Sequence, residues 1–204
     1  MKSPYNAIKI NNITGNIRED VYQFLVINNR PQTAEHCMLV GDEAKRIAEI
    51  FNVNIEAAEV AGYLHDISAV FANEVRVQVA QELELEVLPE EKIFPMIIHQ
   101  KISKAMARDI FNVQSPEILD AVGCHTTLRK GSTILDKVLF VADKIRWDQA
   151  GNPPYLGEIL KGLNRSLEHA AFAYINYLWN EREKLRVVHP WLRDAYYELK
   201  EQLG

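Results

Sequence analysis

Histidine and aspartate side chains interrupt several apolar segments of this chain. The clearest case is the stretch AGYLHDISAV, residues 61–70, in which His65 and Asp66 follow an apolar run. Burying an imidazole beside a carboxylate is unfavourable unless something pairs with them. The same kinds of side chain lie in or end four further apolar segments, namely His36 in TAEHCMLV, His99 in PMIIHQKIS, His125 in ILDAVGCH and Asp143 in VLFVADKI. A bound cation explains all of them at once, with imidazole nitrogens and carboxylate oxygens as ligands.

The donor types restrict the metal. Histidine and aspartate without cysteine suit iron, manganese, zinc or nickel, and they argue against calcium. Six ligands exceed what one structural zinc needs, so we expect two adjacent divalent ions that share a carboxylate and leave positions open for water and substrate. Such paired ions activate a hydroxide for a phosphoryl-type displacement, with His65 and Asp66 at its catalytic centre. The alternative for His65 alone is a histidine at the edge of the core, bonded to its neighbour.

Helical periodicity predicts the elements that position these side chains. Asn16 with Glu19 forms a capping box, Asn54 caps a helix that leads to His65, and Ser115 followed by Pro116 opens another. The expected helices cover 16–29, 31–51, 55–64, 71–83, 89–98, 101–111, 115–125, 132–145 and 159–185, and a last one starts at Pro190. Strand patterns and internal repeats are absent from the sequence, so we expect an all-α single domain over 16–204 after an N-terminal tail over 1–15. Residues 147–156 form the longest expected loop, and whether it closes over a substrate is left open.

Composition and charge exclude several classes of protein. The chain has 204 residues, is 48% hydrophobic and 25% charged, and carries a net charge of −5. Because it lacks a dense Lys/Arg stripe, we expect no nucleic-acid partner. It also lacks an apolar run of membrane-spanning length and an apolar leader, so we expect no membrane association. Its two cysteines, Cys37 and Cys124, predict packing residues in a reduced, cytoplasmic setting.

The order His36, His65-Asp66, His99, His125 and Asp143 resembles the HD superfamily of metal-dependent phosphohydrolases. Within it, HTTLRKGSTILDKVLFVADKI, residues 125–145, is similar to the segment His-Thr-Thr-x-Arg, Leu-x-Lys, Phe-x-Ala-Asp of the YqeK family, the bacterial symmetrical diadenosine tetraphosphate hydrolases. The segments EILDAVGCHTT and VVHPWLRDAYYEL also fit, so the resemblance runs from about residue 17 to 203.

The resemblance implies a compact helical HD-domain fold with a centre of two metal ions, reported as iron in this family. By matching positions, His36, His65, Asp66 and Asp143 hold one ion, and Asp66 bridges to a second ion held by His99 and His125. The implied reaction is attack by a metal-bound hydroxide that splits the nucleotide substrate, diadenosine tetraphosphate, into two ADP. Arg129 is the implied phosphate contact, since a guanidinium binds phosphate oxygens in bidentate fashion.

The other expected substrate contacts each have a structural alternative. Thr126 and Thr127 donate to phosphate or terminate a helix, and Lys104 and Arg146 add positive potential or lie on solvated faces. Trp147 and Trp191 stack on adenine or pack in the core. An aromatic face with Phe172, Tyr174, Tyr177 and Trp179 is core or a subunit contact, which leaves a homodimer open.

Three positions depart from the family pattern. Thr33 stands where an arginine is usual, with Arg30 nearby, Ala69 stands where a lysine is common, and residues 144–147 read Lys-Ile-Arg-Trp in place of Tyr-Ile-Glu-Pro. These positions lie outside the metal ligands, where they shape the substrate pocket. Ala69 and residues 144–147 motivate one alternative, hydrolysis of another nucleotide (a nucleoside mono-, di- or triphosphate). A separate alternative is a non-catalytic nucleotide-binding regulatory module, against which the intact ligand set argues. A helical interaction domain without metal is the fallback.

Overall fold

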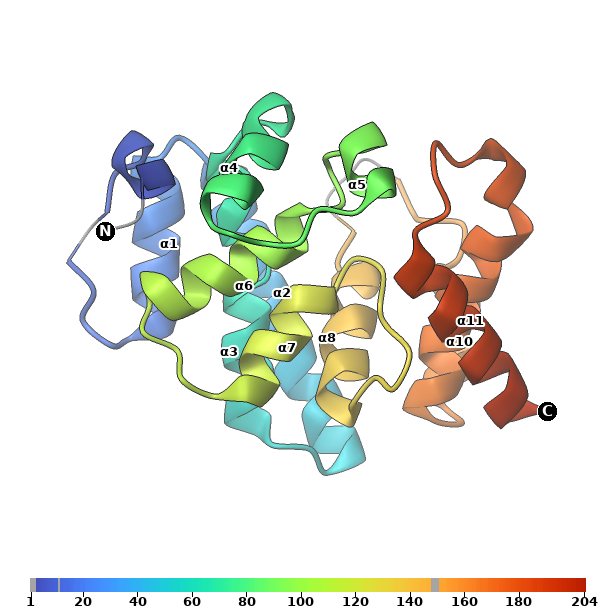
Figure 1. Ribbon diagram of the computed structural model, residues 1–204. Helices are drawn as coiled ribbons and strands as arrows, with labels where there is room; N and C mark the ends of the chain where they lie inside the picture. Colours follow the sequence, from blue (N-terminus) through green and yellow to red (C-terminus); the bar gives the residue numbers. More distant parts are fainter. Residues whose placement is uncertain (1–2, 11, 148–150) are drawn as a thin grey trace.

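Every regular element is a helix in the part of the chain that the computed structural model describes, residues 3–10, 12–147 and 151–204 (Figure 1). The α-helices are α1 (Ile17–Ile27), α2 (Pro31–Phe51), α3 (Ile55–Leu64), α4 (Arg76–Glu82), α5 (Pro89–Ile93), α6 (His99–Asp109), α7 (Pro116–Cys124), α8 (Ile134–Ile145), α9 (Leu156–Leu163), α10 (Leu167–Asn180) and α11 (Pro190–Leu203). Short 3-10 helices cover Ser3–Ala7, Ile67–Val70, Asn73–Val75 and Arg182–Lys184. The prediction of an all-α fold is confirmed.

Local hydrogen bonds and prolines start several helices where the sequence predicts. Asn16 Oδ1 accepts from the Glu19 N–H at 3.3 Å, and Asn54 Oδ1 accepts from the Ala57 N–H at 3.0 Å. These bonds satisfy amide groups that have no partner in the first turn of a helix. Prolines occupy the first turn of α2, α7 and α11. Ser115 stands at the N-cap position of α7 but makes no capping bond there.

Some predicted boundaries were wrong. Instead of a helix over 71–83, α4 begins only at Arg76, and the helix predicted over 89–98 ends at Ile93. Phe94 has φ −130° and ψ 80° because it precedes Pro95, whose ring disfavours the helical conformation of the residue before it. The helix expected over 101–111 runs two residues earlier, from His99 to Asp109.

The long helix predicted over 159–185 is two helices, α9 and α10. Ser166 is extended, with φ −168° and ψ 169°, and its Oγ accepts from the His169 N–H at 3.2 Å, which caps α10. The apolar pattern continues across this break because both helices bury one face. Residues 148–150, in the expected loop before α9, lie outside the described residues.

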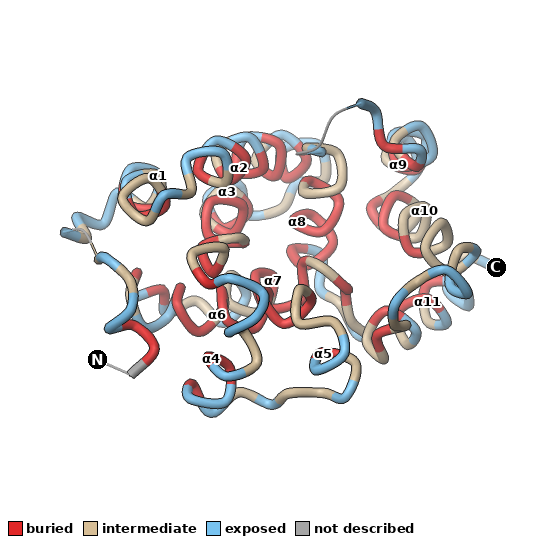
Figure 2. Tube along the Cα trace, turned by 90° about the horizontal axis from the view of Figure 1, so that it is seen from above, coloured by how far each residue is buried: buried red, intermediate tan, exposed pale blue. Residues whose placement is uncertain are grey.

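The centre of the molecule consists of α2, which packs against α3 and α8. Figure 2 shows buried residues concentrated on α2, α3, α6, α7 and α8, whereas outer turns of α1, α9 and α11 are exposed. The helix α10 packs against α8 and α11, and α9 packs against α10 (Figure 2). No helix in the described part has the length and apolar character needed to cross a bilayer.

Two glycines bring α2 and α3 into unusually close contact. A Cβ atom added to Gly62 on α3 would lie 2.5 Å from the Gly41 Cα and 2.7 Å from the Gly41 nitrogen on α2. Only glycine lets two backbones approach this closely. Since His36 lies on α2 and His65 follows α3, this contact helps to set the distance between the two imidazoles.

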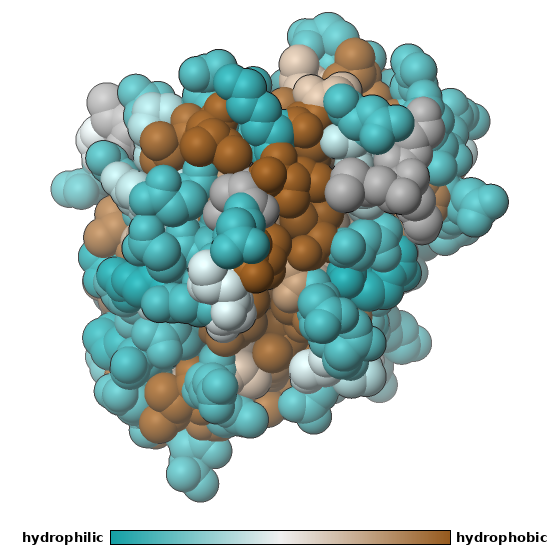
Figure 3. Space-filling model, turned by 90° about the vertical axis from the view of Figure 1, so that its left-hand side faces the viewer, coloured by the Kyte–Doolittle hydropathy of each residue, from teal (hydrophilic) through white to brown (hydrophobic). Residues whose placement is uncertain are grey.

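Residues of the expected N-terminal tail contact the helices. Tyr5 is buried, and its hydroxyl donates to Asp109 at 3.0 Å. Ile8, Ile10 and Ile13 are partly buried against the core. On the side of the molecule that carries α1, Figure 3 shows hydrophobic side chains gathered between hydrophilic ones.

Candidate metal centre

The six histidine and aspartate side chains singled out in the sequence meet at one place. They come from separate elements: His36 from α2, His65 and Asp66 from the end of α3, His99 from the start of α6, His125 from the end of α7 and Asp143 from α8. The four imidazoles are buried, and the two carboxylates are mostly shielded from solvent. Tertiary packing therefore joins residues that are up to 107 positions apart in the chain.

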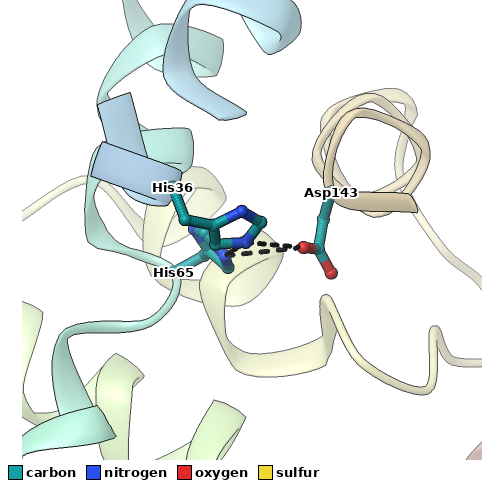
Figure 4. A group of neighbouring side chains, drawn as sticks. All are labelled: His36, His65 and Asp143. Carbon is teal, nitrogen blue, oxygen red and sulfur yellow. Dashed lines mark hydrogen bonds and ion pairs between the residues drawn. The ribbon is translucent and has the colours of Figure 1, made fainter. Parts of the chain in front are cut away.

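The first half of this cluster comprises His36, His65 and Asp143. His36 Nε2 lies 3.2 Å from Asp143 Oδ1, and His65 Nε2 lies 3.6 Å from the same oxygen. The two Nε2 atoms are 3.2 Å apart. Figure 4 shows both rings turned toward the Asp143 carboxylate. One ligand atom from each residue lies within 4.8 Å of the others, a spacing that allows all three to bind one cation.

The second half is arranged around Asp66. Asp66 Oδ1 lies 3.0 Å from His99 Nε2 and 3.5 Å from His125 Nε2. The other oxygen, Oδ2, lies 3.6 Å from His65 Nε2. His65, Asp66 and His125 form a second group with ligand atoms within 4.8 Å of one another. Asp66 thus presents one oxygen to each half of the cluster, which is the arrangement a bridging carboxylate needs.

Backbone carbonyls fix the orientation of three of the imidazoles. The Nδ1 atoms of His65, His99 and His125 lie 2.7, 2.5 and 2.8 Å from the carbonyl oxygens of Gly62, Met96 and Val122. A carbonyl only accepts, so Nδ1 carries the proton in each ring and, in the neutral ring, Nε2 presents a lone pair.

These lone pairs point into the cluster. His99 Nε2 and His125 Nε2 are only 2.9 Å apart, a distance at which two unprotonated nitrogens repel. A cation between the rings turns this repulsion into coordination. Histidine ligands that donate the other ring N–H to a carbonyl are the usual arrangement at metal sites. The side chains therefore fit a divalent metal ion.

The pKa values of two histidines and both aspartates of the cluster are lowered from their ordinary values. Burial lowers the pKa of His65 to about 4, and it also lowers the pKa of His125. Burial alone would raise the pKa of Asp66, but the imidazoles of His65 and His99 outweigh it and hold that pKa well below its ordinary value. For Asp143, Lys144 is the main group that outweighs burial and keeps the pKa well below normal. Neutral imidazoles and ionised carboxylates are the forms that bind metals.

A cavity of about 220 Å³ opens over the cluster. Five of the six expected ligands line it, and His65 lies buried beneath. The other lining residues are Met96, Thr126, Lys144, Arg146, Trp147, Tyr155 and Tyr174. The cavity thus combines a floor of candidate metal ligands with two cations and three aromatic rings.

The expected substrate contacts divide between two places. Thr126 and Arg146 line the cavity, and Thr126 Oγ1 lies 3.2 Å from His99 Nε2. Thr127 is buried and hydrogen-bonded to Gln100 and to the Leu128 carbonyl, so it stabilises the turn after α7.

The structure does not bring Lys104 and Arg129 to this cavity. They line a separate cavity, where both donate to the Asp120 carboxylate, Lys104 at 2.5 Å and Arg129 at 3.2 Å. Arg129 also donates to Asp136 at 3.0 Å. The expectation that Arg129 is the main phosphate contact is not supported by this placement, because two carboxylates already occupy its guanidinium.

Other residues of the cavity had only weak signals in the sequence. Lys144 contacts Asp143, and its ammonium lies 5.5 Å from the centre of the Tyr174 ring. Tyr174 was expected in the core or at a subunit contact, yet it lines the cavity with Trp147. Tyr155 follows the Pro-Pro pair of the predicted loop and had no expected role. Its ring lies 6.0 Å from that of Trp147, a contact that no sequence periodicity could indicate.

The remaining histidines and both cysteines lie outside the cluster. His189 caps α11 by accepting from the Trp191 N–H at 3.2 Å, and His169 contacts Ser166 at the start of α10. Cys37 and Cys124 are buried thiols, as expected for packing residues.

Comparison with known proteins agrees with this geometry. Residues 33–148, more than half of the chain, match the model of the HD domain. An uncharacterized protein encoded in the pepC 5′ region of Lactococcus lactis subsp. cremoris is 40% identical over 180 residues, which are 88% of this chain and 90% of that protein. The symmetrical bis(5′-nucleosyl)-tetraphosphatase of Bacillus subtilis is 30% identical over 137 residues, covering 66% of this chain and 71% of the relative.

A solved structure confirms the predicted fold. The crystal structure of a predicted HD superfamily hydrolase involved in NAD metabolism, from Clostridium acetobutylicum, superposes with a TM-score of 0.81 at 22% sequence identity. The match covers 90% of this chain and 97% of that one. The helices described above are thus arranged as in a single HD-fold domain.

Proposed function

This chain belongs to the HD domain family and is a metal-dependent phosphohydrolase, and from that premise we propose that it splits diadenosine tetraphosphate symmetrically into two ADP. The observation that carries the proposal is the convergence of six His and Asp side chains on the floor of a cavity that also presents cations and aromatic rings. The resemblance of residues 125–145 to the YqeK segment and the tetraphosphatase relatives support the choice of substrate.

We assign one ion to His36, His65, Asp66 and Asp143, and a second to Asp66, His99 and His125. The ions are two iron ions by family resemblance, and the same donors accept manganese, zinc or nickel. When bound, such a pair of cations lowers the pKa of water and neutralises charge on phosphoryl oxygens.

The protein side chains orient this centre and the substrate. The carbonyl of Gly62 holds the His65 ring, and the two oxygens of Asp66 face opposite halves of the cluster. Thr126, beside His99, is placed to donate a hydrogen bond to a phosphate oxygen at the floor of the cavity. Lys144 lines the same cavity and adds positive charge where the phosphates must lie.

The size of the cavity limits which part of the substrate it encloses. Pockets that bury a whole drug-sized ligand measure roughly 300–1,000 Å³, and this one measures about 220 Å³. It therefore encloses the ions and phosphate groups, while the adenosines lie at its mouth. Trp147, Tyr155 and Tyr174 line the cavity and supply ring surfaces on which a base can stack.

Incubation of the purified protein with diadenosine tetraphosphate and Fe²⁺ or Mn²⁺ tests the proposal. We expect two ADP for each substrate consumed, and we expect the His99→Ala variant to lose this activity. His169→Ala is the matched control, since His169 lies away from the cluster and should leave turnover unchanged. Products ATP and AMP, or turnover of other nucleotides without this one, would refute the symmetrical reaction.

Hydrolysis of a different nucleotide is the second candidate. It is favoured by Ala69 and by residues 144–147, where the chain departs from the YqeK pattern. Lys144, Arg146 and Trp147 all line the cavity, so the departure changes the substrate-facing wall. A panel of nucleoside mono-, di- and triphosphates, each assayed for phosphate release, separates this candidate from the first.

A further inference from the structure

Glu43 is a buried carboxylate on α2 and is not one of the six expected metal ligands. Only 2% of its surface is exposed. It lies seven residues, or about two helical turns, after His36, and therefore on the same face of α2. A buried carboxylate requires partners that compensate its charge, and Glu43 has two arginines.

The two arginines divide the carboxylate between them. Arg46 donates Nε and Nη2 to Oε1 at 3.0 and 2.5 Å, and Arg146 donates Nη2 to Oε2 at 2.7 Å. Two guanidinium charges against one carboxylate leave a net charge of about +1. Only Arg146 lines the cavity over the His/Asp cluster.

Arg146 also has unused hydrogen-bonding capacity. Its Nε is buried and has no hydrogen-bond partner within the described residues. A buried donor without a partner is costly, so an acceptor placed there by a ligand is favoured. Lys144, the other cation of the cavity, is already engaged with Asp143 and the His125 carbonyl. Arg146 is thus the cation of the cavity wall with a donor to spare.

We propose that Glu43 positions Arg146 to bind a phosphate group of the nucleotide next to the phosphate that lies over the metal ions. The guanidinium fork matches a phosphate group, and the fixed contact with Glu43 lowers the entropy lost on binding. The site therefore takes the second phosphate of a nucleoside diphosphate unit, and Glu43 acts as a positioning residue. The inference rests on the proposed nucleotide substrate but does not require that substrate to be diadenosine tetraphosphate.

Binding of two nucleotides that differ by one phosphate tests this assignment. We would measure, by calorimetry on manganese-loaded protein, the affinity of the α,β-methylene analogue of ADP and of AMP. In R146Q we expect about tenfold weaker binding of the diphosphate, the loss of one charge-assisted hydrogen bond, and little change for AMP. E43Q should weaken the diphosphate in the same selective way, because Arg146 loses its anchor.

R46Q is the matched control. It removes the same charge and a bond to the same carboxylate, but Arg46 does not line the cavity, so both affinities should stay unchanged. R146K keeps the charge without the planar fork and should show a smaller, still selective loss. It keeps the test decisive if R146Q fails to fold.

Three results would overturn the proposal: equal losses in R46Q and R146Q, equal losses for AMP and the diphosphate, or no loss in R146Q or R146K. Loss of manganese from R146Q, measured by elemental analysis, would also overturn it by assigning Arg146 to the metal centre. If diadenosine tetraphosphate is not hydrolysed but the selective loss is observed, the proposed function fails while this inference stands.

Discussion

Gly62 lies where α2 and α3 come closest, and a methyl group has no room there. In Gly62→Ala, the new Cβ would lie 2.5 Å from the Gly41 Cα and 2.7 Å from the Gly41 nitrogen. Ordinary van der Waals contacts begin at 3.4 Å. Both obstacles are backbone atoms, which cannot rotate away like the end of a side chain. The two helices must therefore separate by about 1 Å.

Overpacking of this kind costs about 1–3 kcal/mol, and the better helix propensity of alanine returns up to about 1 kcal/mol. We therefore expect a net loss of roughly 1–2 kcal/mol in the free energy of unfolding, or about 2–8 °C in Tm for a chain of this size. The Gly62 carbonyl also accepts from His65 Nδ1 at 2.7 Å. Because the substitution displaces this support of a proposed metal ligand, metal affinity should fall about 10–100-fold.

Thermal unfolding of the metal-free protein and a metal titration measure the two effects separately. Gly157→Ala is the control, since a Cβ on Gly157 in α9 meets no heavy atom within 4 Å. The same chemical change should there leave metal affinity unchanged and keep or slightly raise Tm. A Gly62→Ala variant as stable as the wild type, or an equal loss of Tm in Gly157→Ala, would refute the close-contact reasoning.

Three further variants or conditions test the site and its scaffold. Asp66→Ala should lose both metal ions because one carboxylate oxygen faces each half of the cluster, whereas His99→Ala should lose mainly one ion. Equal metal loss from the two variants in elemental analysis would contradict separate sites. The metal-free protein should lose stability as pH falls from 6.5 toward 4, because His65 has its pKa lowered to about 4 and stays neutral while the unfolded chain takes up a proton. Denaturant titrations should show this slope reduced in His65→Gln, and an unchanged slope would argue against a buried neutral imidazole. Thr133→Ala removes the cap of α8, where Thr133 Oγ1 accepts from the Asp136 N–H at 3.1 Å. The free energy of unfolding should fall by about 1 kcal/mol, and the metal content should stay unchanged. A Tm equal to that of the wild type would mean that the cap contributes nothing.

The sequence predicted the features that depend on near neighbours in the chain. Asn16 and Asn54 cap their helices through bonds to residues three positions away, so the pattern of residue types contains the whole interaction. The break between α9 and α10 was missed although it is also local. Ser166 caps a new helix there, but the apolar periodicity continues across the break, so the pattern indicated one helix.

The convergence of the His and Asp side chains was predictable for a different reason. A buried imidazole or carboxylate is so unfavourable without a partner that its presence in an apolar segment indicates one. That argument selected His36, His99, His125 and Asp143 without any knowledge of distances. Burial alone does not predict which oxygen of Asp66 faces which imidazole, because these contacts depend on how α3, α6 and α7 pack.

For charged groups at the surface, no comparable signal exists in the sequence. An arginine is stable in solvent or beside any carboxylate, so its type does not reveal its partner. Arg129 looked like a phosphate ligand and is engaged by Asp120 and Asp136, whereas Arg146 lines the cavity because Glu43, on another helix, holds it there. The sequence by itself thus determined the helical class and the His and Asp side chains that meet in one buried cluster, since burial makes both unavoidable. Only the tertiary structure decided which cations line the cavity over the cluster, because that depends on contacts between segments about a hundred residues apart.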